Sequence, residues 1–398
     1  MKENYEKYLS ILRSFVQNTA PEALTSGELE KVSELARINS TGGILNYVCL
    51  SHPGLVDSAC REQMRRQCFA EIGMYAQRAE MTRQLAGELD KAGIDFILFK
   101  GYVVRNYYPV PELRTFGDVD IIIHKEDRQK SDELMMALGF TRKEDWEPSY
   151  SYSRGTEFYE LHSRVIGFDV SDKADFVGYF SHIWEHSQPA QVVNLPHAWE
   201  LKPEFHFLYM LTHVAKHISR SGAGVRMYLD LAFFIKHFGT SLDWAWVVSE
   251  MEKLNLADFA AVALTAVERW FCVESPMVLR QVSEEVLEDF TEFTISGGVY
   301  GYVGKDQGEV FLKQQNRNEE RVSKFKTLMR HAFPDAEVLM NKYAYLKKRP
   351  WLLPVAWVQR FLDKRNEWGR FANSTKQIIS ADKEKVLKLK RIYKEIGL

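Results

Sequence analysis

Apolar residues recur at helical spacing in the first part of the chain and again in its second half. In the first part, the helical spacing covers residues 5–16, 28–50 and 60–89. In the second half, it covers residues 205–217, 225–238, 257–272, 283–295, 320–332, 352–371 and 382–396. The pattern therefore predicts helices on both sides of a central region.

Short apolar runs rich in strand-forming residues predict a sheet in that central region. The runs cover residues 94–99, 118–123 and about 157–165, and residues 192–195 are a possible fourth strand. Helical patterns separate them, and two of these helices are predicted to end at Gly93 and Gly139. Three helix-strand pairs in succession predict a compact α+β unit with a small mixed sheet.

These patterns divide the chain into three parts. They are an N-terminal helical segment at 1–77, an α/β core at 78–200 and a larger C-terminal helical domain at 201–398. The polar, glycine-containing stretch at 304–318 is predicted to be a mobile loop.

Composition narrows the class of protein. The 398 residues include 52 Lys and Arg against 54 Asp and Glu, so the net charge is -2 and strong general binding to nucleic acid is not expected. Four cysteines without a C-x-x-C pair, no signal peptide and no apolar run long enough to span a membrane indicate a cytoplasmic protein.

Two carboxylates stand at the start of the second predicted strand. Because side chains alternate along a strand, Asp118 and Asp120 point to one side and Val119 and Ile121 to the other. Neighbouring carboxylates raise each other's pKa unless a cation neutralises them, and hard oxygen ligands favour Mg²⁺ or Mn²⁺. The alternative is a pair of ordinary polar residues at the exposed start of a strand.

A Lys-Gly junction directly follows the first predicted strand. Gly101 lets a phosphate approach backbone N–H groups at a helix start, and Lys100 adds a positive charge. Alone, such a junction is usually only a turn. Followed by Arg114, Gly117 and the two aspartates, it indicates a nucleotide-binding loop.

Several segments together resemble a known family, the uncharacterised bacterial nucleotidyltransferases of the DNA polymerase β superfamily. The resemblance covers most of the chain from about residue 78, and its segments are Phe99-Lys-Gly101, Tyr107-Tyr-Pro109, Arg114-Thr-Phe-Gly-Asp-Val-Asp-Ile-Ile-Ile123, Glu126-Asp127, Leu138-Gly-Phe140, Glu160-Leu-His162, His213-Val-Ala-Lys-His217, Arg226, Leu229-Asp230, Phe333-Pro334 and Pro350-Trp-Leu-Leu-Pro354. The chain is more distantly similar to nucleotidyltransferase toxins of abortive-infection systems. It departs from the superfamily where Gly101-Tyr102 replaces the usual Gly-Ser.

The resemblance implies a two-metal nucleotidyl transfer site. Asp118 and Asp120 would bind both ions, and a third carboxylate on a neighbouring strand would complete the site. Glu160 matches the family's Glu-Leu-His segment, and alternation puts it beside His162 on one strand face. Asp169 and Asp172 are alternative third carboxylates, and sequence distance does not decide between them.

The predicted helix at 205–217 presents nitrogen-bearing side chains on one face. His213 and His217 could chelate zinc, although Val214 excludes the H-E-x-x-H pattern. Lys216 instead favours a phosphate or acceptor site, and a solvated or core-packed helix is the other alternative. Arg226 could join this side of the cleft or form an intrahelical ion pair with Asp230.

The predicted function is Mg²⁺-dependent transfer of a nucleoside monophosphate from an NTP to a hydroxyl acceptor. The acceptor could be a small molecule, tRNA or protein. Two alternatives are a nucleotide-binding regulatory module without turnover and a toxin-like transferase that modifies tRNA or protein. The predicted site residues are Asp118, Asp120 and Glu160 for metal and catalysis, Lys100, Gly101, Arg114 and Gly117 for the nucleotide, and His162, His213, Lys216, His217 and Arg226 on the acceptor or phosphate side.

Overall fold

A computed structural model describes residues 2–167, 170–171, 173–239, 241–299, 301, 324–340, 343–347, 349–363, 375–376, 378–380 and 382–398. The predicted loop at 304–318 lies outside the described residues, as do Asp169 and Asp172. Within the described residues, no helix is long and apolar enough to cross a membrane.

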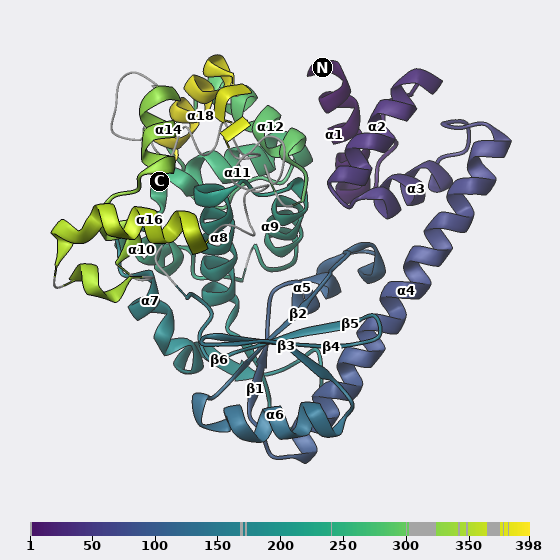
Figure 1. Cartoon of the computed structure of the whole chain (residues 1–398). Helices are drawn as coiled ribbons and strands as arrows, with labels where there is room; N and C mark the ends of the chain where they lie inside the picture. The colour runs from purple at the N-terminus through teal and green to yellow at the C-terminus, as the bar shows by residue number, and fades with distance from the viewer. Residues whose placement is uncertain are drawn as a thin grey trace.

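Four helices form the N-terminal part: α1 Lys2–Gln17, α2 Ser26–Ile38, α3 Gly42–Ser51 and α4 Ser58–Lys91. The predicted helical stretch at 28–50 is two helices, because Asn39 ends α2 and Ser40 takes a left-handed φ of 52°. The predicted stretch at 60–89 belongs to the single 34-residue helix α4, which runs along the right side of Figure 1.

One mixed sheet of seven strands follows, in the order β3-β4-β5-β2-β1-β7-β6. The strands are β1 Phe96–Leu98, β2 Val119–Ile123, β3 Thr141–Trp146, β4 Ser149–Arg154, β5 Glu157–His162, β6 Ser187–Pro189 and β7 Ala198–Leu201. The three firm strand predictions and the mixed sheet are confirmed: β1 runs antiparallel to β2, and β2 runs parallel to β5.

The possible strand at 192–195 is wrong. These residues form the loop that joins β6 to β7, and Val193 is buried because it packs onto the core beneath the sheet rather than because it pairs in a ladder. Strands β3, β4, β6 and β7 were not predicted. In β3, residues 141–145 are exposed and carry no apolar alternation at this edge of the sheet.

Short helical segments connect the strands: α5 Gly101–Val104, η1 Arg105–Tyr107, η2 Pro111–Leu113, η3 Lys125–Asp127, α6 Arg128–Ala137, α7 Phe176–Tyr179 and η4 Phe180–His186. Between the first two predicted strands, α5 and η1 form the expected helical segment, and Gly139 follows α6 with a φ of 83°.

The rest of the described chain is helical. Its elements are α8 Pro203–Arg220, α9 Val225–Phe238, α10 Trp244–Lys253, α11 Ala257–Phe271, α12 Glu284–Gly297, α14 Lys324–Ala332, α15 Ala336–Leu339, η5 Ala344–Lys347, η6 Pro350–Leu352, α16 Leu353–Asp363 and α18 Lys383–Glu395. No strand follows β7 within the ranges given above. The α+β architecture with helices at both ends of the chain is confirmed, whereas the division at residues 77 and 200 stays a prediction.

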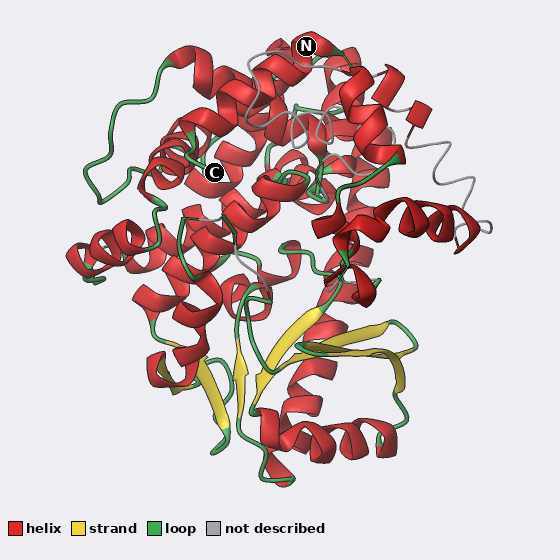
Figure 2. Ribbon diagram, turned by 60° about the vertical axis from the view of Figure 1, so that its left-hand side comes forward, coloured by secondary structure: helices red, strands yellow, loops and turns green. Residues whose placement is uncertain are grey.

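The sheet lies between two helical layers (Figures 1 and 2). On one side, α4 and α6 cover a core that includes Leu98 and Ile121. On the other side, Ile97 and Ile122 join the large core formed by the N-terminal and C-terminal helices. Even-numbered residues of β2 therefore face the C-terminal helices, and Asp120 shares this face.

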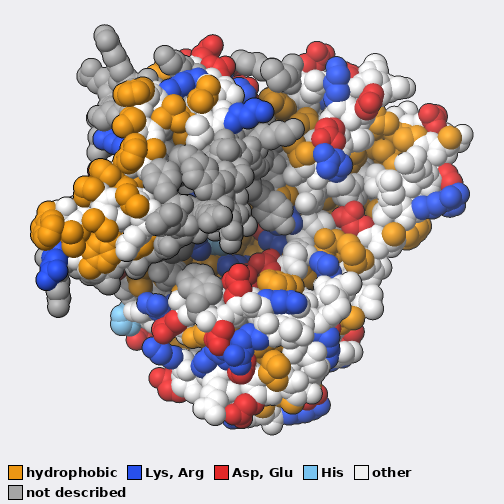
Figure 3. All heavy atoms as spheres, viewed as in Figure 1, with side chains coloured by type: hydrophobic (Ala, Val, Ile, Leu, Met, Phe, Trp, Pro, Cys, Tyr) orange, Lys and Arg blue, Asp and Glu red, His pale blue; other side chains and the backbone are white. Residues whose placement is uncertain are grey.

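Surface charge is mixed on the described part of the face drawn in Figure 3, where Lys and Arg side chains lie among Asp and Glu. This mixture agrees with the absence of a global positive field expected from composition. The same view shows apolar side chains gathered over α14 and α16, where Trp351, Val358 and Phe325 are exposed.

Candidate active site

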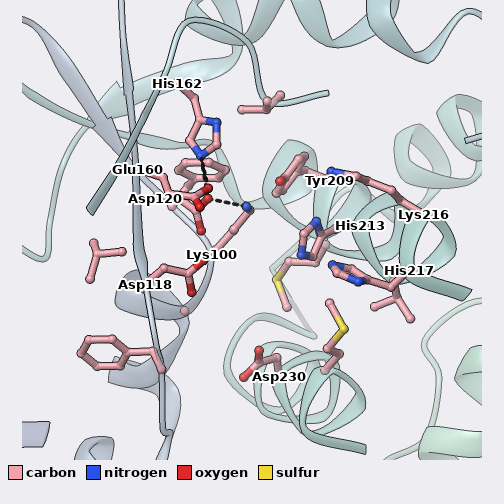
Figure 4. A pocket seen from close by; sticks show the side chains of 18 of the residues that line it. Lys100, Asp118, Asp120, Glu160, His162, Tyr209, His213, Lys216, His217 and Asp230 are labelled. Atoms are coloured by element: carbon pink, nitrogen blue, oxygen red, sulfur yellow. Dashed lines mark hydrogen bonds and ion pairs between the residues drawn. The ribbon is translucent and has the colours of Figure 1, made fainter. Parts of the chain in front are cut away.

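A cavity of about 610 Å³ lies between the sheet and helices α8 and α9. Figure 4 shows the carboxylates of the sheet on one side and the polar face of α8 on the other. Every predicted site residue except Gly117 lines this cavity. The structure thus brings together residues from α5, β2, β5, α8 and α9 that lie far apart in the sequence.

The three predicted metal-binding carboxylates come from adjacent strands. Asp120 on β2 is the direct register partner of Glu160 on β5, and Asp118 immediately precedes β2 on the same face. Asp120 is 9% exposed, Glu160 is half-buried and Asp118 is exposed at the rim of the cavity. Loss of solvation, followed by the charge of Asp120, raises the pKa of Asp118.

Lys100 compensates the most buried carboxylate. Its backbone has a φ of 53°, which is uncommon outside glycine, and this conformation turns the chain sharply after β1. The Nζ atom donates to Oδ1 of Asp120 at 2.7 Å. Burial opposes the charge of Lys100, but Asp120 raises its pKa above the ordinary value.

His162 binds the same oxygen. Its Nε2–H donates to Oδ1 of Asp120 at 2.8 Å, and Nε2 lies 3.4 Å from Oε2 of Glu160. Burial opposes the protonated imidazole, but its bond to Asp120 raises the pKa of His162. In turn, burial opposes ionisation of Asp120, while Lys100 and His162 hold its pKa well below the usual range.

The donor set of this cluster fits a divalent cation. One ligand atom each from Asp120, Glu160 and His162 lie within 4.8 Å of one another. Asp118 adds a carboxylate on the same side of the sheet, and carboxylate oxygens are the ligands that Mg²⁺ and Mn²⁺ prefer. Burial and then the charges of Asp120 and Glu160 raise the pKa of Asp118, and Lys100 lowers it, so a bound cation would further favour its ionised form.

Arg114 is held by the helical part of the protein. Its Nε donates to Oδ1 of Asp230 at 3.1 Å and its Nη2 to Oδ2 at 2.6 Å. Tyr108 also donates its hydroxyl to Oδ1 of Asp230, at 2.7 Å. The alternative intrahelical pair of Arg226 with Asp230 is wrong, because Asp230 binds Arg114 and Arg226 donates to the backbone and hydroxyl of Thr115.

Gly101 leaves room for this arginine. A Cβ at residue 101 would lie 2.1 Å from Nη1 of Arg114, so a larger residue and the guanidinium cannot occupy their present places together. Gly117, by contrast, lies outside the cavity, and a Cβ there would meet nothing within 4 Å.

Gly101→Ala is therefore expected to destabilise the protein by about 1–3 kcal/mol, the usual cost of overpacking a rigid site. The guanidinium cannot move away cheaply because Asp230 binds it through two hydrogen bonds. Urea unfolding measures the loss. Gly117→Ala is the matched control and should change the free energy of unfolding by less than about 0.5 kcal/mol; equal effects of the two variants would contradict the steric argument.

The predicted acceptor side lies on α8. His213, Lys216 and His217 line the cavity, and the rings of the two histidines are 4.6 Å apart. Within the described residues, neither histidine belongs to a group of three possible metal ligands, so the zinc alternative gains no third ligand. Burial and nearby cations lower the pKa of His217 to about 4 and that of Lys216 to about 8.

Sequence reasoning missed two polar cavity residues on this helix. Tyr209 is fully buried and Arg220 is exposed, and both line the cavity. Tyr209 is four residues before His213, so helical spacing could have placed it on the same face. Its apolar neighbours made it indistinguishable from a core tyrosine in the sequence.

Comparison with known proteins gives one family. A family model described as "Uncharacterised nucleotidyltransferase" matches residues 26–272. The match begins within the N-terminal helices, earlier than the resemblance read from the sequence, and ends before Phe333-Pro334.

Among solved structures, the solution structure of the antibiotic-resistance factor ANT(2'')-Ia is similar with 12% sequence identity and a TM-score of 0.35. The similarity covers 47% of this chain and 96% of that chain. No curated protein matches this chain significantly.

Proposed function

The chain belongs to the uncharacterised nucleotidyltransferase family, and from this membership we propose that it transfers a nucleoside monophosphate from an NTP to an acceptor hydroxyl. The observation that carries the proposal is the register of Asp120 with Glu160, which sets two carboxylates side by side, with Asp118 on the same face of the sheet. A cytoplasmic location stays a prediction.

Asp118, Asp120 and Glu160 would hold divalent metal, Mg²⁺ or Mn²⁺. When bound, such ions activate the acceptor hydroxyl and neutralise the leaving pyrophosphate. Lys100 already offers positive charge at Asp120, and Arg114 adds a second cation beside Gly101. We propose that this side of the cavity receives the phosphates of the NTP.

The transfer forms one bond and breaks one. The acceptor oxygen bonds to the α-phosphorus while the bond from that phosphorus to the leaving pyrophosphate breaks, and a carboxylate oxygen of Glu160 takes the hydroxyl proton. His162, which lies 3.4 Å from Glu160, would orient that carboxylate. Residues of α8 and α9 line the cavity opposite the sheet, and water displaced from it by the bound substrates would strengthen its electrostatics.

A regulatory nucleotide-binding module without turnover is the second candidate. Two observations favour it: Lys100 and His162 both bind Oδ1 of Asp120, and Arg114 fills the space beside Gly101. In addition, Tyr102 supplies no small hydroxyl side chain where the superfamily has serine. A toxin-like transferase would use the same chemistry on tRNA or protein.

Incubation with Mg²⁺, cell extract and α-³²P-labelled NTPs tests the proposal. The expected result is Mg²⁺-dependent NTP consumption with label in one product fraction. Ultrafiltration, nuclease and protease treatment then separate a small acceptor from tRNA and protein. Absence of NTP consumption, with retained NTP binding, would favour the regulatory module.

Glu160→Gln should lower kcat by at least about 100-fold, a loss of about 2.7 kcal/mol in transition-state stabilisation, while NTP affinity changes little. The reason is that Glu160 acts on the acceptor side, where charge develops only in the transition state. Single-turnover kinetics and calorimetry measure the two quantities. Asp169→Asn is the matched comparison; if it loses turnover and Glu160→Gln does not, Asp169 is the third carboxylate.

A further inference from the structure

The wall of the cavity formed by α8 differs in charge from the wall formed by the sheet. Asp118, Asp120 and Glu160 lie on the sheet side. Residues 209–220 of α8 contain no Asp or Glu, and five of their polar side chains line the cavity: Tyr209, His213, Lys216, His217 and Arg220. We call these five residues the α8 wall; Figure 4 labels all of them except Arg220.

Two polar atoms of the α8 wall are buried and form no hydrogen bond of ordinary geometry among the described residues, although one of them, the Tyr209 hydroxyl, lies beside Lys100. They are the hydroxyl of Tyr209 and Nδ1 of His213. The Tyr209 side chain is fully buried, and its hydroxyl faces the cavity. Burial raises the pKa of Tyr209 to about 12, so the hydroxyl keeps its proton and remains a donor. Buried donors of this kind are normally satisfied, so a ligand with acceptor oxygens fits here.

Positive charges crowd the same wall. The pKa of Lys216 is lowered first by burial and then by Lys100 and Arg220, while Asp120 and Glu160 act more weakly in the opposite direction. Like charges brought together in a partly buried site destabilise one another unless an anion lies between them. The α8 wall is therefore arranged for a negatively charged ligand.

The first turn of α9 adds to this field. Gly224, Arg226 and Met227 line the cavity, and Gly224 caps α9 without a side-chain hydrogen bond. The amide groups at a helix start carry partial positive charge and favour anions. This helix end supports the α8 wall, whose buried donors and cations are independent of it.

We propose that the α8 wall binds a phosphate group carried by the acceptor, which makes the acceptor a phosphorylated small molecule. The inference rests on the proposed nucleotidyl transfer. The donor's phosphates would lie at Lys100 and Gly101, and Glu160, the carboxylate assigned to the acceptor hydroxyl, acts electrostatically on Lys216. A cavity of about 610 Å³ is in the size range of small-molecule sites. The same charges disfavour a polycationic acceptor.

Calorimetry of the full chain with inorganic phosphate tests the proposal, with and without saturating Mn²⁺ and α,β-methylene-ATP. Phosphate is expected to bind in both states with affinities that agree within about threefold. Lys216→Gln and Arg220→Gln should each weaken phosphate binding by about 10- to 100-fold, the usual effect of losing a charged hydrogen bond, and leave the affinity for the ATP analogue unchanged.

Two further variants make the test decisive. Tyr209→Phe removes only the buried hydroxyl and should weaken phosphate binding by about fivefold without lowering Tm. Lys31→Gln, on an exposed position of α2, is the matched control and should change nothing. If the two charge variants do not fold, the phosphate affinity of Tyr209→Phe decides the test.

Three outcomes overturn the inference. They are absence of phosphate binding, binding that the variants do not weaken, and competition between phosphate and the ATP analogue, which would assign the α8 wall to the donor triphosphate. A different outcome separates the two proposals. If the ATP analogue does not bind but the variants still weaken phosphate binding, the proposed transferase function is contradicted and the anion site remains supported.

Discussion

Asp118→Asn is expected to lower kcat for nucleotidyl transfer by about 10³-fold and to leave the fold intact. The loss corresponds to several kcal/mol of charge stabilisation, which is what a metal ligand contributes to such a reaction. Because Asp118 is exposed and its pKa is raised by desolvation and by Asp120, neutralising it relieves repulsion and should not lower Tm. Single-turnover assays with labelled NTP measure the rate.

Asp127→Asn is the matched control. Asp127 ends η3 a few residues beyond β2, lies outside the cavity and caps α6 without a side-chain hydrogen bond. It should retain the wild-type rate. Asp120→Asn is a poorer test, because it leaves Lys100 buried without its carboxylate and mixes catalytic loss with unfolding. Wild-type turnover by Asp118→Asn would remove Asp118 from the proposed site.

Asp230→Ala is expected to reduce the free energy of unfolding by about 3–5 kcal/mol, the cost of leaving a buried charge without its partner. The variant leaves the guanidinium of Arg114, which is 9% exposed, without its carboxylate partner. It also removes the acceptor of the Tyr108 hydroxyl. The site should loosen too, since the contact of Arg114 with Gly101 depends on this pair. Urea titration followed by circular dichroism measures the stability.

Two comparisons separate burial from charge in this experiment. Replacing all three partners with apolar residues, in Arg114→Met, Asp230→Leu and Tyr108→Phe combined, should recover most of the stability, because no buried polar group is then unpaired. Glu88→Ala breaks the exposed pair of Glu88 with Lys91 and should cost less than about 1 kcal/mol. A cost for Asp230→Ala no larger than that of Glu88→Ala would contradict the assigned role.

Side-chain direction along each element followed from the sequence. Alternation in β2 and β5 put Asp118 with Asp120, and Glu160 with His162, on shared strand faces, and the structure has the same arrangement. Helical spacing likewise put His213, Lys216 and His217 toward one cavity. These relations are local, because the backbone geometry of a single strand or helix fixes them.

The partners of those side chains were decided by the tertiary structure. Asp120 binds His162, which is 42 positions away in the sequence, and Asp230 binds Arg114, which is 116 positions away. Local helical spacing had instead indicated Arg226 as the partner of Asp230. Edge strand β3 was also not predicted, because its exposed residues show no alternation of apolar and polar positions. Strand order, burial and the sharing of charges depend on which distant elements pack together, and the hydrophobic pattern of one segment does not encode that choice. The sequence by itself determined the faces and the chemistry they carry; only packing decided which faces meet.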